Sequence, residues 1–265
     1  MEQFIKEITK KAGAAILKKF GKVGIKYTKK DATDVVTEAD LIANKIIIDA
    51  IKKKYPDHAI ISEETGEYQV GAEYCWIIDP LDGTRNFSTR TPMFAVMVGL
   101  ARNDEMKMAT VYNPCANELF FAQKGKGAFL NNKRVHCSKQ KTWKDSWGLI
   151  SANLSERNAA VMDKLLKYSK KEIFWVSALG SGGVSAMYQA NGRRDWRISR
   201  GGGLWDYAPT SLILSEAGCK VTNFILKLPR LAPHGFLLRH QPRRSRPRCR
   251  MSFFMYTKAA SSLTI

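Results

Sequence analysis

Apolar residues recur at intervals of three and four in the first segment of the chain, which predicts an amphipathic helix. A second amphipathic helix is predicted from about Glu38 to Lys54. Further helices are predicted near 156–169, 183–190 and 206–216. The predicted apolar faces consist of Phe4, Ile5, Ile8, Ala12, Ala15 and Ile16 in the first helix and Ala39, Ile42, Ile46, Ala50 and Ile51 in the second.

Short apolar runs replace this helical spacing in the middle of the chain. They are bounded by Gly, Pro, Asn and Asp, which is typical of strands. Asn131-Asn132 predicts a tight hairpin turn. Because helices come first, strands fill the middle and alternation follows, we expect a layered α+β or mixed α/β sandwich. The runs lie at 59–62, 74–79, 94–101, 108–112 and 118–123.

The length and the charge pattern divide the chain into a domain and a tail. A chain of 265 residues can bury a large core. We expect one domain over 1–224, with packed lobes at about 1–140 and 141–224. The formal charge of +19 would suggest a polyanionic partner. However, the stretch from Gly218 to the end holds ten Lys or Arg residues and no acidic residue, so the charge describes the tail more than the domain.

The segment 225–265 has an atypical composition, for which two interpretations stay open. It is either a disordered basic tail that binds nucleic acid or membrane, or the product of a reading-frame error near Asn223. We favour the frame error, because many arginines lie among large apolar residues, a composition unlike that of a disordered tail maintained by selection. The block 191–203 is similarly unusual for the interior of a compact domain.

The remaining composition points to a cytoplasmic protein. No apolar run approaches the roughly 20 residues that span a bilayer, so we expect no membrane association. The first residues mix charges with apolar residues, unlike a signal peptide. Five cysteines are an odd number without paired spacing, which favours neither a disulfide framework nor a zinc site.

Candidate chemistry is concentrated in four acidic segments, at 31–40, 61–64, 76–87 and 204–218. In the third, a strand that ends in Asp-Pro places Asp79 at the carboxyl end of a sheet, where sites commonly form. Asp82 would lie close to Asp79, and like charges at such a distance need a cation. The amides after Asp82 would offer an anion site beside that cation. A cation beside an anion site suits phosphoryl chemistry.

Each acidic residue also has a purely structural interpretation. Asp82 and Asp206 fit the N-cap positions of following helices. Asp40 follows Thr37 at a spacing close to a capping box. Glu63 and Glu64 fit a solvated strand end. The combination of all these residues, more than any one of them, favours a site.

The combination resembles the inositol monophosphatase family, part of the lithium-sensitive, magnesium-dependent sugar phosphatase superfamily. The family pattern Asp-Pro-hydrophobic-Asp-Gly-Thr-x-Asn-Phe is present as residues 79–87. The family's Trp-Asp and Glu-Ala-Gly motifs are present at 205–206 and 216–218. The resemblance covers about 1–224 and implies an inositol monophosphatase-like catalytic domain with the sugar-phosphatase fold. The tail does not resemble the family's final strand and helix.

The resemblance also implies a role for each motif residue. Glu63, Asp79 and the Leu81 carbonyl would hold a first Mg²⁺, and Asp79, Asp82 and Asp206 a second. A third ion would use Glu63 through water. Thr84, oriented by Asp40, would help to activate water. The remaining implied roles are phosphate binding by the amides of Gly83 and Thr84, lining of the substrate site by Ser181 and Gly182, and support of the site by Glu64.

The residue types agree with these implied roles. All the proposed ligands are hard oxygens, and no histidine falls in the motifs, which favours Mg²⁺ or Mn²⁺ over zinc. No Ser-His-Asp or Cys-His nucleophile occurs at these positions, so direct attack by water is expected.

The resemblance implies a small phosphorylated metabolite as substrate and a homodimer as the assembly. Inositol-1-phosphate is the first candidate, and Asn86 favours it. Ser199 replaces a family glutamate that contacts inositol, so fructose 1,6-bisphosphate, nucleotide 3′-phosphates and NADP remain alternatives. A nucleic-acid-binding protein on the same scaffold is a further alternative, although the arginine-rich stretch at 239–250 lacks aromatic interleaving. A folded but inactive phosphatase also stays open.

Overall fold

The computed structural model describes residues 1–22, 25–28, 35–151, 156–199, 202–223 and 254–257. The helices are α1 (Glu2–Lys19), α2 (Glu38–Lys54), α3 (Thr84–Ser88), α4 (Glu156–Ser169), α5 (Gly182–Ala190) and α6 (Leu204–Glu216). The strands are β1 (Ile25–Thr28), β2 (Val35–Thr37), β3 (Ala59–Ser62), β4 (Gly66–Tyr68), β5 (Tyr74–Asp82), β6 (Ala95–Arg102), β7 (Glu105–Asn113), β8 (Glu118–Gln123), β9 (Gly127–Leu130), β10 (Lys133–Val135), β11 (Trp147–Ser151), β12 (Trp175–Ser177), β13 (Trp196–Ser199), β14 (Lys220–Asn223) and β15 (Phe254–Thr257).

The described strands form two large sheets and one small one. The first large sheet has eight strands in the order β10-β9-β8-β7-β6-β5-β3-β4. It is antiparallel except where β3 pairs with β5. The second has five strands in the order β12-β11-β13-β15-β14, with β11 parallel to both of its neighbours. The small sheet is the antiparallel pair β1-β2.

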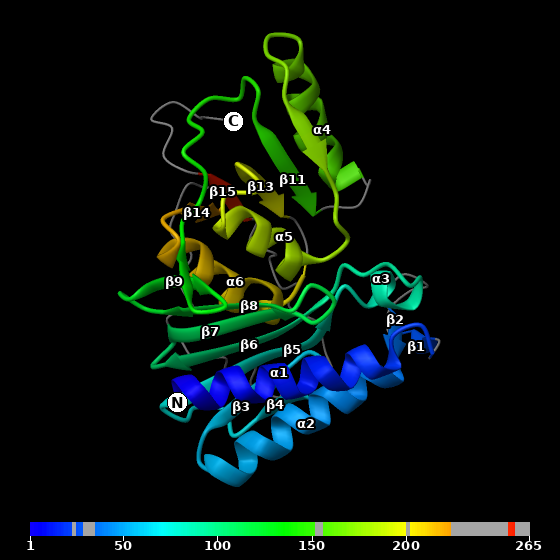
Figure 1. Ribbon diagram of the computed structural model, residues 1–265, viewed down its shortest axis with the longest axis vertical. Helices are drawn as coiled ribbons and strands as arrows, with labels where there is room; N and C mark the ends of the chain where they lie inside the picture. Colours follow the sequence, from blue (N-terminus) through cyan, green and yellow to red (C-terminus); the bar gives the residue numbers. More distant parts are fainter. Residues whose placement is uncertain (23–24, 29–34, 152–155, 200–201, 224–253, 258–265) are drawn as a thin grey trace, which may run out of the picture.

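Helices and sheets alternate in layers (Figure 1). Helices α1 and α2 bury one apolar cluster against one face of the eight-stranded sheet. Helices α5 and α6 bury a second cluster against its other face. The five-stranded sheet lies beyond α5 and α6, and a third cluster joins it to α4. The expected layered sandwich is therefore confirmed, and α5 and α6 form the layer between its two large sheets.

The helices predicted from the apolar spacing are present. Helix α2 has the predicted bounds, because a capping box of Thr37 and Asp40 starts it and a run of lysines occupies its last turn. Its most buried apolar stripe differs from the predicted one. Of the predicted residues, Ala39 and Ile51 are buried, whereas Ile42, Ile46 and Ala50 are only partly buried. The buried apolar stripe of α2 is completed by Ala43 and Ile47.

The sequence predicted that strand β5 ends at Asp79, and this prediction is wrong. The strand continues to Asp82, and its register with β6 shifts between these two residues. Pro80 lies inside the irregularity, where a residue without an N–H group is tolerated. The predicted hairpin turn at Asn131-Asn132 is confirmed, with φ of 46° and 66° between β9 and β10. The strands that neither the apolar runs nor the predicted hairpin revealed are β1, β2, β4, β11, β12, β13, β14 and β15.

The block 191–203 takes part in the fold where it is described. Strand β13 lies between β11 and β15 in the five-stranded sheet, and all four of its residues are buried. The block thus supplies interior structure, despite its unusual composition. Most of the basic segment lies outside the described residues, and β15 is its described part. Among the described residues, no helix is both long and apolar enough to cross a membrane.

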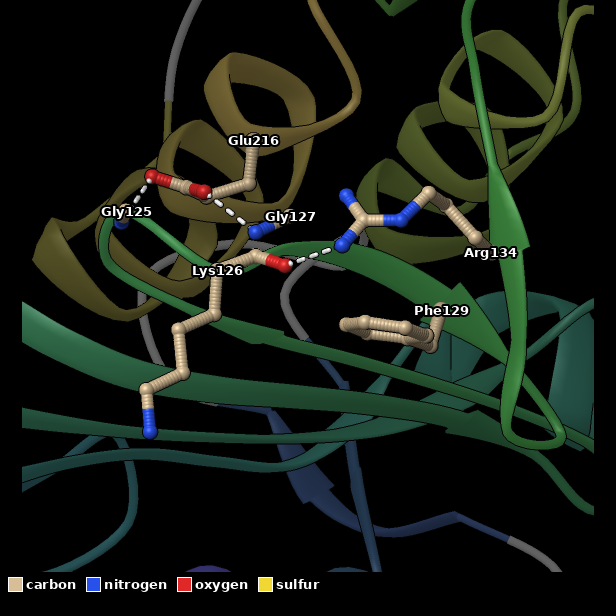
Figure 2. A pocket seen from close by; sticks show the side chains of 6 residues that line it. All are labelled: Gly125, Lys126, Gly127, Phe129, Arg134 and Glu216. Carbon is tan, nitrogen blue, oxygen red and sulfur yellow. Dashed lines mark hydrogen bonds between the residues drawn. The ribbon is translucent and has the colours of Figure 1, made fainter.

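Glu216, in the Glu-Ala-Gly motif, fastens the end of α6 to the turn between β8 and β9 (Figure 2). Its two carboxylate oxygens accept hydrogen bonds from the amides of Gly125, at 2.8 Å, and Gly127, at 2.7 Å. Arg134 donates to the Lys126 carbonyl at 2.8 Å and closes the same turn. The motif glutamate therefore has a structural role, which joins the α5–α6 layer to the eight-stranded sheet.

Glu216→Gln is expected to lower stability without lowering turnover. The amide side chain has a single acceptor oxygen for two backbone donors, so about 1 kcal/mol is lost. The melting temperature should fall by about 3 °C. Glu67→Gln, on the exposed strand β4, is the matched control and should melt like the native chain. Equal melting temperatures for the two variants would contradict this role for Glu216.

Candidate active site

Three carboxylates from distant parts of the chain converge between the eight-stranded sheet and α6. Asp79 and Asp82 come from the end of β5, and Asp206 from the first turn of α6. One oxygen of each lies within 4.8 Å of the others. Asp79 and Asp82 are buried, and Asp206 is partly exposed. The bulge in β5 lets Asp79 and Asp82 reach the same point from one strand.

Asp82 is held by the amino-terminal end of α5. Its Oδ1 accepts the amide of Gly182 at 2.9 Å, and its Oδ2 accepts the amide of Gly183 at 2.7 Å and the Ser181 hydroxyl. Ser181 Oγ in turn accepts the amide of Val184 at 3.1 Å and so caps α5. These donors fix the Asp82 carboxylate at a position where a negative charge is favourable.

Asp79 and Asp206 are held by local backbone donors. The amide of Leu81 donates to Asp79 Oδ1 at 3.1 Å. The amide of Gly203, the N-cap residue of α6, donates to Asp206 Oδ2 at 2.5 Å. The interpretation of Asp206 as the N-cap of α6 is wrong, because Gly203 is the N-cap and Asp206 is the third helical residue. From that position its carboxylate caps the Gly203 amide and also belongs to the cluster.

Asp40 and Thr84 form a hydrogen-bonded pair beside the cluster. Thr84 Oγ1 lies 3.0 Å from Asp40 Oδ1 and 2.9 Å from the Leu81 carbonyl oxygen. The other oxygen of Asp40 accepts the amide of Thr37, at 2.7 Å, and its hydroxyl, at 2.6 Å. The capping role and the orienting role of Asp40 are therefore both present, one on each oxygen.

The two glutamates after β3 lie at the rim of the site and are partly buried. The charge of Glu63 raises the pKa of Asp79 and Asp206, which places it near the cluster, although it is outside the group of three. The charge of Glu64 raises the pKa of Asp40. Both glutamates thus lie near carboxylates of the site, and their predicted roles stay predictions.

Gly83 and Asn86 hold the Asp-Gly-Thr turn in place. Gly83 has φ of 85°, and a Cβ there would lie 3.0 Å from both the Met93 carbonyl oxygen and Ser181 Cβ, so no side chain fits. The Asn86 amide donates at 2.7 Å to the carbonyls of Met93 and Leu179. In this structure Asn86 thus joins α3 to the loop before α5. The predicted substrate contacts of Ser181 and Gly182 stay predictions, and both residues hydrogen-bond to Asp82.

The electrostatics of the cluster favour a cation. Burial, and then repulsion from Glu63 and the other carboxylates, raises the pKa of Asp79 well above its usual 3.8. Burial raises the pKa of Asp82, and burial together with the charge of Asp82 raises the pKa of Asp206 to about 7. Burial also raises the pKa of Asp40 to about 6. A divalent cation would relieve this repulsion, and carboxylate oxygens are the ligands of Mg²⁺ and Mn²⁺, so the residues fit such an ion.

The metal-free protein is expected to lose stability as the pH rises. With its pKa raised to about 7, Asp206 keeps a proton in the folded state that the unfolded chain releases near pH 4. This contribution is complete below about pH 4 and disappears as the pH rises through 7. In EDTA the melting temperature should be about 5 °C lower at pH 8 than at pH 5.5.

Mg²⁺ should reverse this trend, because it competes with protons for the same oxygens. The rise in melting temperature on adding Mg²⁺ should be larger at pH 8 than at pH 5.5. Differential scanning fluorimetry at both pH values measures both effects. A melting temperature in EDTA that increases from pH 5.5 to pH 8 would contradict the charge repulsion assigned to this cluster.

Sequence analysis missed one charged residue of the site, Arg197 on β13. Its side chain is 1% exposed, and its Nη2 donates to Ser199 Oγ at 3.1 Å. Its charge lowers the pKa of Asp82 and Asp206. The sequence signal that could have revealed it was the alternation of Arg197 and Ser199 with apolar residues in a short strand. This strand lies in the block 191–203, whose composition is unusual for the interior of a domain.

The layered sandwich and the buried carboxylate cluster define a protein of the sugar-phosphatase fold class. A family model described as "Inositol monophosphatase family" matches residues 1–245. The fructose-1,6-bisphosphatase/inositol-1-monophosphatase of Thermotoga maritima is 33% identical over 222 residues, which cover 82% of each chain. The Nus factor SuhB of Escherichia coli is 36% identical over 221 residues, 81% of this chain and 82% of that protein.

Solved structures agree with the sequence comparisons. The Thermotoga maritima IMPase structure has a TM-score of 0.81 and 27% identity, and the alignment covers 96% of this chain and 91% of that one. The chain belongs to the inositol monophosphatase family.

Proposed function

We propose that this protein is a magnesium-dependent phosphatase that hydrolyses inositol-1-phosphate by direct attack of water. The observation that carries the proposal is the convergence of Asp79, Asp82 and Asp206 beside the hydrogen-bonded pair of Thr84 and Asp40. Family membership supports phosphatase chemistry, and the carboxylates supply the oxygens that such chemistry needs.

The residues that would hold magnesium are the acidic residues of the site and one carbonyl. Glu63, Asp79 and the Leu81 carbonyl would hold a first ion, and Asp79, Asp82 and Asp206 a second. Glu63 would assist a third through water, and Mn²⁺ suits the same oxygens. Bound Mg²⁺ supplies Lewis-acid stabilisation of phosphate charge and lowers the pKa of water. Glu64 would support these groups from the rim.

Thr84 is suited to orient a water molecule and to help remove its proton. A hydroxyl has one proton and two lone pairs. Since both observed neighbours of Thr84 Oγ1, Asp40 Oδ1 and the Leu81 carbonyl, are acceptors, its proton points toward them. A lone pair is then available to accept a hydrogen bond from water. Asp40, whose pKa is raised to about 6 in the metal-free protein, is suited to act as the base behind Thr84.

Residues at the start of α3 and α5 would bind the substrate. The amides of Gly83 and Thr84, at the start of α3, would hold the phosphate. Ser181 and Gly182, which hold Asp82, would line the same site.

The choice of inositol-1-phosphate as the substrate is the most specific part of the proposal. Ser199, in place of a glutamate that contacts inositol in the family, is buried and bonded to Arg197. The printed name of the Thermotoga relative joins fructose-1,6-bisphosphatase to inositol monophosphatase. Fructose 1,6-bisphosphate is therefore the first alternative, followed by a nucleotide 3′-phosphate and NADP.

The deciding experiment is phosphate release from inositol-1-phosphate, fructose 1,6-bisphosphate, 3′-phosphoadenosine 5′-phosphate and NADP, each with Mg²⁺ and with EDTA. We expect magnesium-dependent release, greatest for inositol-1-phosphate. Release in EDTA equal to that in Mg²⁺ would overturn the metal assignment, and faster release from another substrate would overturn the choice of inositol. No release from any of the four would favour the inactive scaffold.

We further propose a cytoplasmic homodimer, on the family resemblance and the cysteine pattern. Light scattering after gel filtration tests the dimer. Binding to RNA or DNA is not part of the proposal. Salt-dependent binding that disappears on deletion of 225–265, in a chain without phosphatase activity, would favour the nucleic-acid alternative.

A further inference from the structure

A buried arginine lies beside two of the carboxylates proposed to bind metal. Arg197 is on β13, in the middle of the five-stranded sheet, and is among the largest side chains with almost no exposure. A buried guanidinium is costly unless negative groups surround it. The function proposed above assigns Arg197 no role.

The distances from a side-chain position built on Gly182 show where the guanidinium lies relative to the two carboxylates. A Cβ built on Gly182 would lie 3.3 Å from Arg197 Nη2, 3.4 Å from Asp82 Oδ1 and 4.0 Å from Asp206 Oδ1. The three atoms therefore surround one point, within about 4 Å of it. The hydrogen bond from Nη2 to Ser199 Oγ holds the guanidinium at this point from the side of β13.

The charge of Arg197 acts on both carboxylates. It lowers the pKa of Asp82 and of Asp206, against the larger effect of burial. Backbone amides also hold Asp82 and Asp206, but an amide carries only a partial charge. Within the described residues around Gly182, Arg197 supplies a full positive charge that does not depend on bound metal.

We propose that the Arg197 guanidinium is a fixed cation that holds Asp82 and Asp206 in place before metal binds and weakens the binding of the Mg²⁺ that these carboxylates share. The inference rests on the proposed magnesium site and adds a positioning residue to it. Both effects have the same cause, since a positive charge attracts the carboxylates and repels a divalent cation placed between them. As a result, the cluster binds Mg²⁺ less tightly but is ordered without metal.

The test compares Mg²⁺ binding and metal-free stability in the full-length native chain, Arg197→Met and Arg193→Met. Arg193 is exposed and pairs with Glu118, so its variant removes one positive charge from the surface. Calorimetric titration with MgCl₂ gives the dissociation constant, and fluorimetry in EDTA gives the melting temperature. Arg197→Met should bind the Mg²⁺ that Asp82 and Asp206 share roughly tenfold more tightly than the native chain and melt at a lower temperature in EDTA.

The direction of the change in affinity separates this role from a merely structural one. If Arg197 only filled space, its loss would loosen the site and weaken Mg²⁺ binding. Equal or weaker binding by Arg197→Met, or tighter binding by Arg193→Met, overturns the proposal. Arg197→Lys, which keeps the charge, should bind within about threefold of the native chain.

If Arg197→Met does not fold, a second variant, Arg197→Gln, tests the same proposal. Arg197→Gln keeps an N–H donor on a shorter side chain and loses the charge, so tighter Mg²⁺ binding by it supports the proposal, and unchanged or weaker binding overturns it. A native chain that binds no Mg²⁺ overturns the metal site itself. Native binding without tighter binding in the neutral variants overturns only the role of Arg197.

Discussion

Asp82→Asn is expected to reduce magnesium-dependent phosphate release by roughly a thousandfold. The substitution keeps the shape of the side chain but removes one negative charge from the proposed ligands. It also places an NH₂ group against the donors of α5, because Asp82 accepts from Ser181, Gly182 and Gly183 with both of its oxygens. An amide oxygen can satisfy only one side of this arrangement.

Phosphate release at saturating Mg²⁺ measures the effect, and calorimetric titration should show the loss of one bound ion. Asp49→Asn is the matched control, since Asp49 lies on the exposed face of α2 and pairs with Lys45. The control should keep full activity. If Asp82→Asn is folded and retains even a tenth of native turnover, Asp82 does not hold a catalytic metal.

The sequence predicted those elements whose ends carry local signals. The capping pair Thr37 and Asp40, together with the terminal lysines, specifies α2 from nearby residues alone. The Asn131-Asn132 hairpin is equally local, since asparagine tolerates the positive φ that the turn requires. Elements of this kind depend little on tertiary contacts, so their bounds could be predicted.

The elements that were missed depend on partners distant in the sequence. Strand β13 contains Arg197 and Ser199, and its burial makes sense only once Asp82 and Asp206 have been brought beside it. The continuation of β5 past Pro80 likewise depends on pairing with β6 across a bulge. Apolar patterning cannot reveal a strand whose buried residues are polar, because the partners that satisfy them are not in the same segment.

The sequence predicted which residues belong to the candidate site, but it did not predict how they contact one another. Asp40 was predicted in a capping box, which the structure shows, whereas Asp206 was predicted as an N-cap and lies at the third helical position instead. Each carboxylate binds the N-cap amide of its helix and also has a place in the site. The sequence could not show that α5 would hold Asp82, a contact across about a hundred residues. A carboxylate fixed by backbone donors keeps its position whether or not metal is bound, which is why capping and ligation are compatible in these residues.

Thr84→Val is expected to lower turnover roughly a hundredfold while leaving Mg²⁺ affinity nearly unchanged. Valine has the shape of threonine without the hydroxyl, so the link between water and Asp40 is lost. Asp40 would keep its bonds from Thr37 and lose only the donor at 3.0 Å. Loss of that donor removes a contact that lowers the pKa of Asp40, so the pKa of this carboxyl should rise further.

Thr84→Ser separates the hydroxyl from the methyl group of the same side chain. It keeps the donor to Asp40 and should retain turnover within about tenfold of the native chain. Initial rates over a range of pH and Mg²⁺ concentration distinguish a lower turnover from weaker metal binding. If valine and serine at this position were equally active, water would be oriented without Thr84, and Asp40 would act only as the cap of α2.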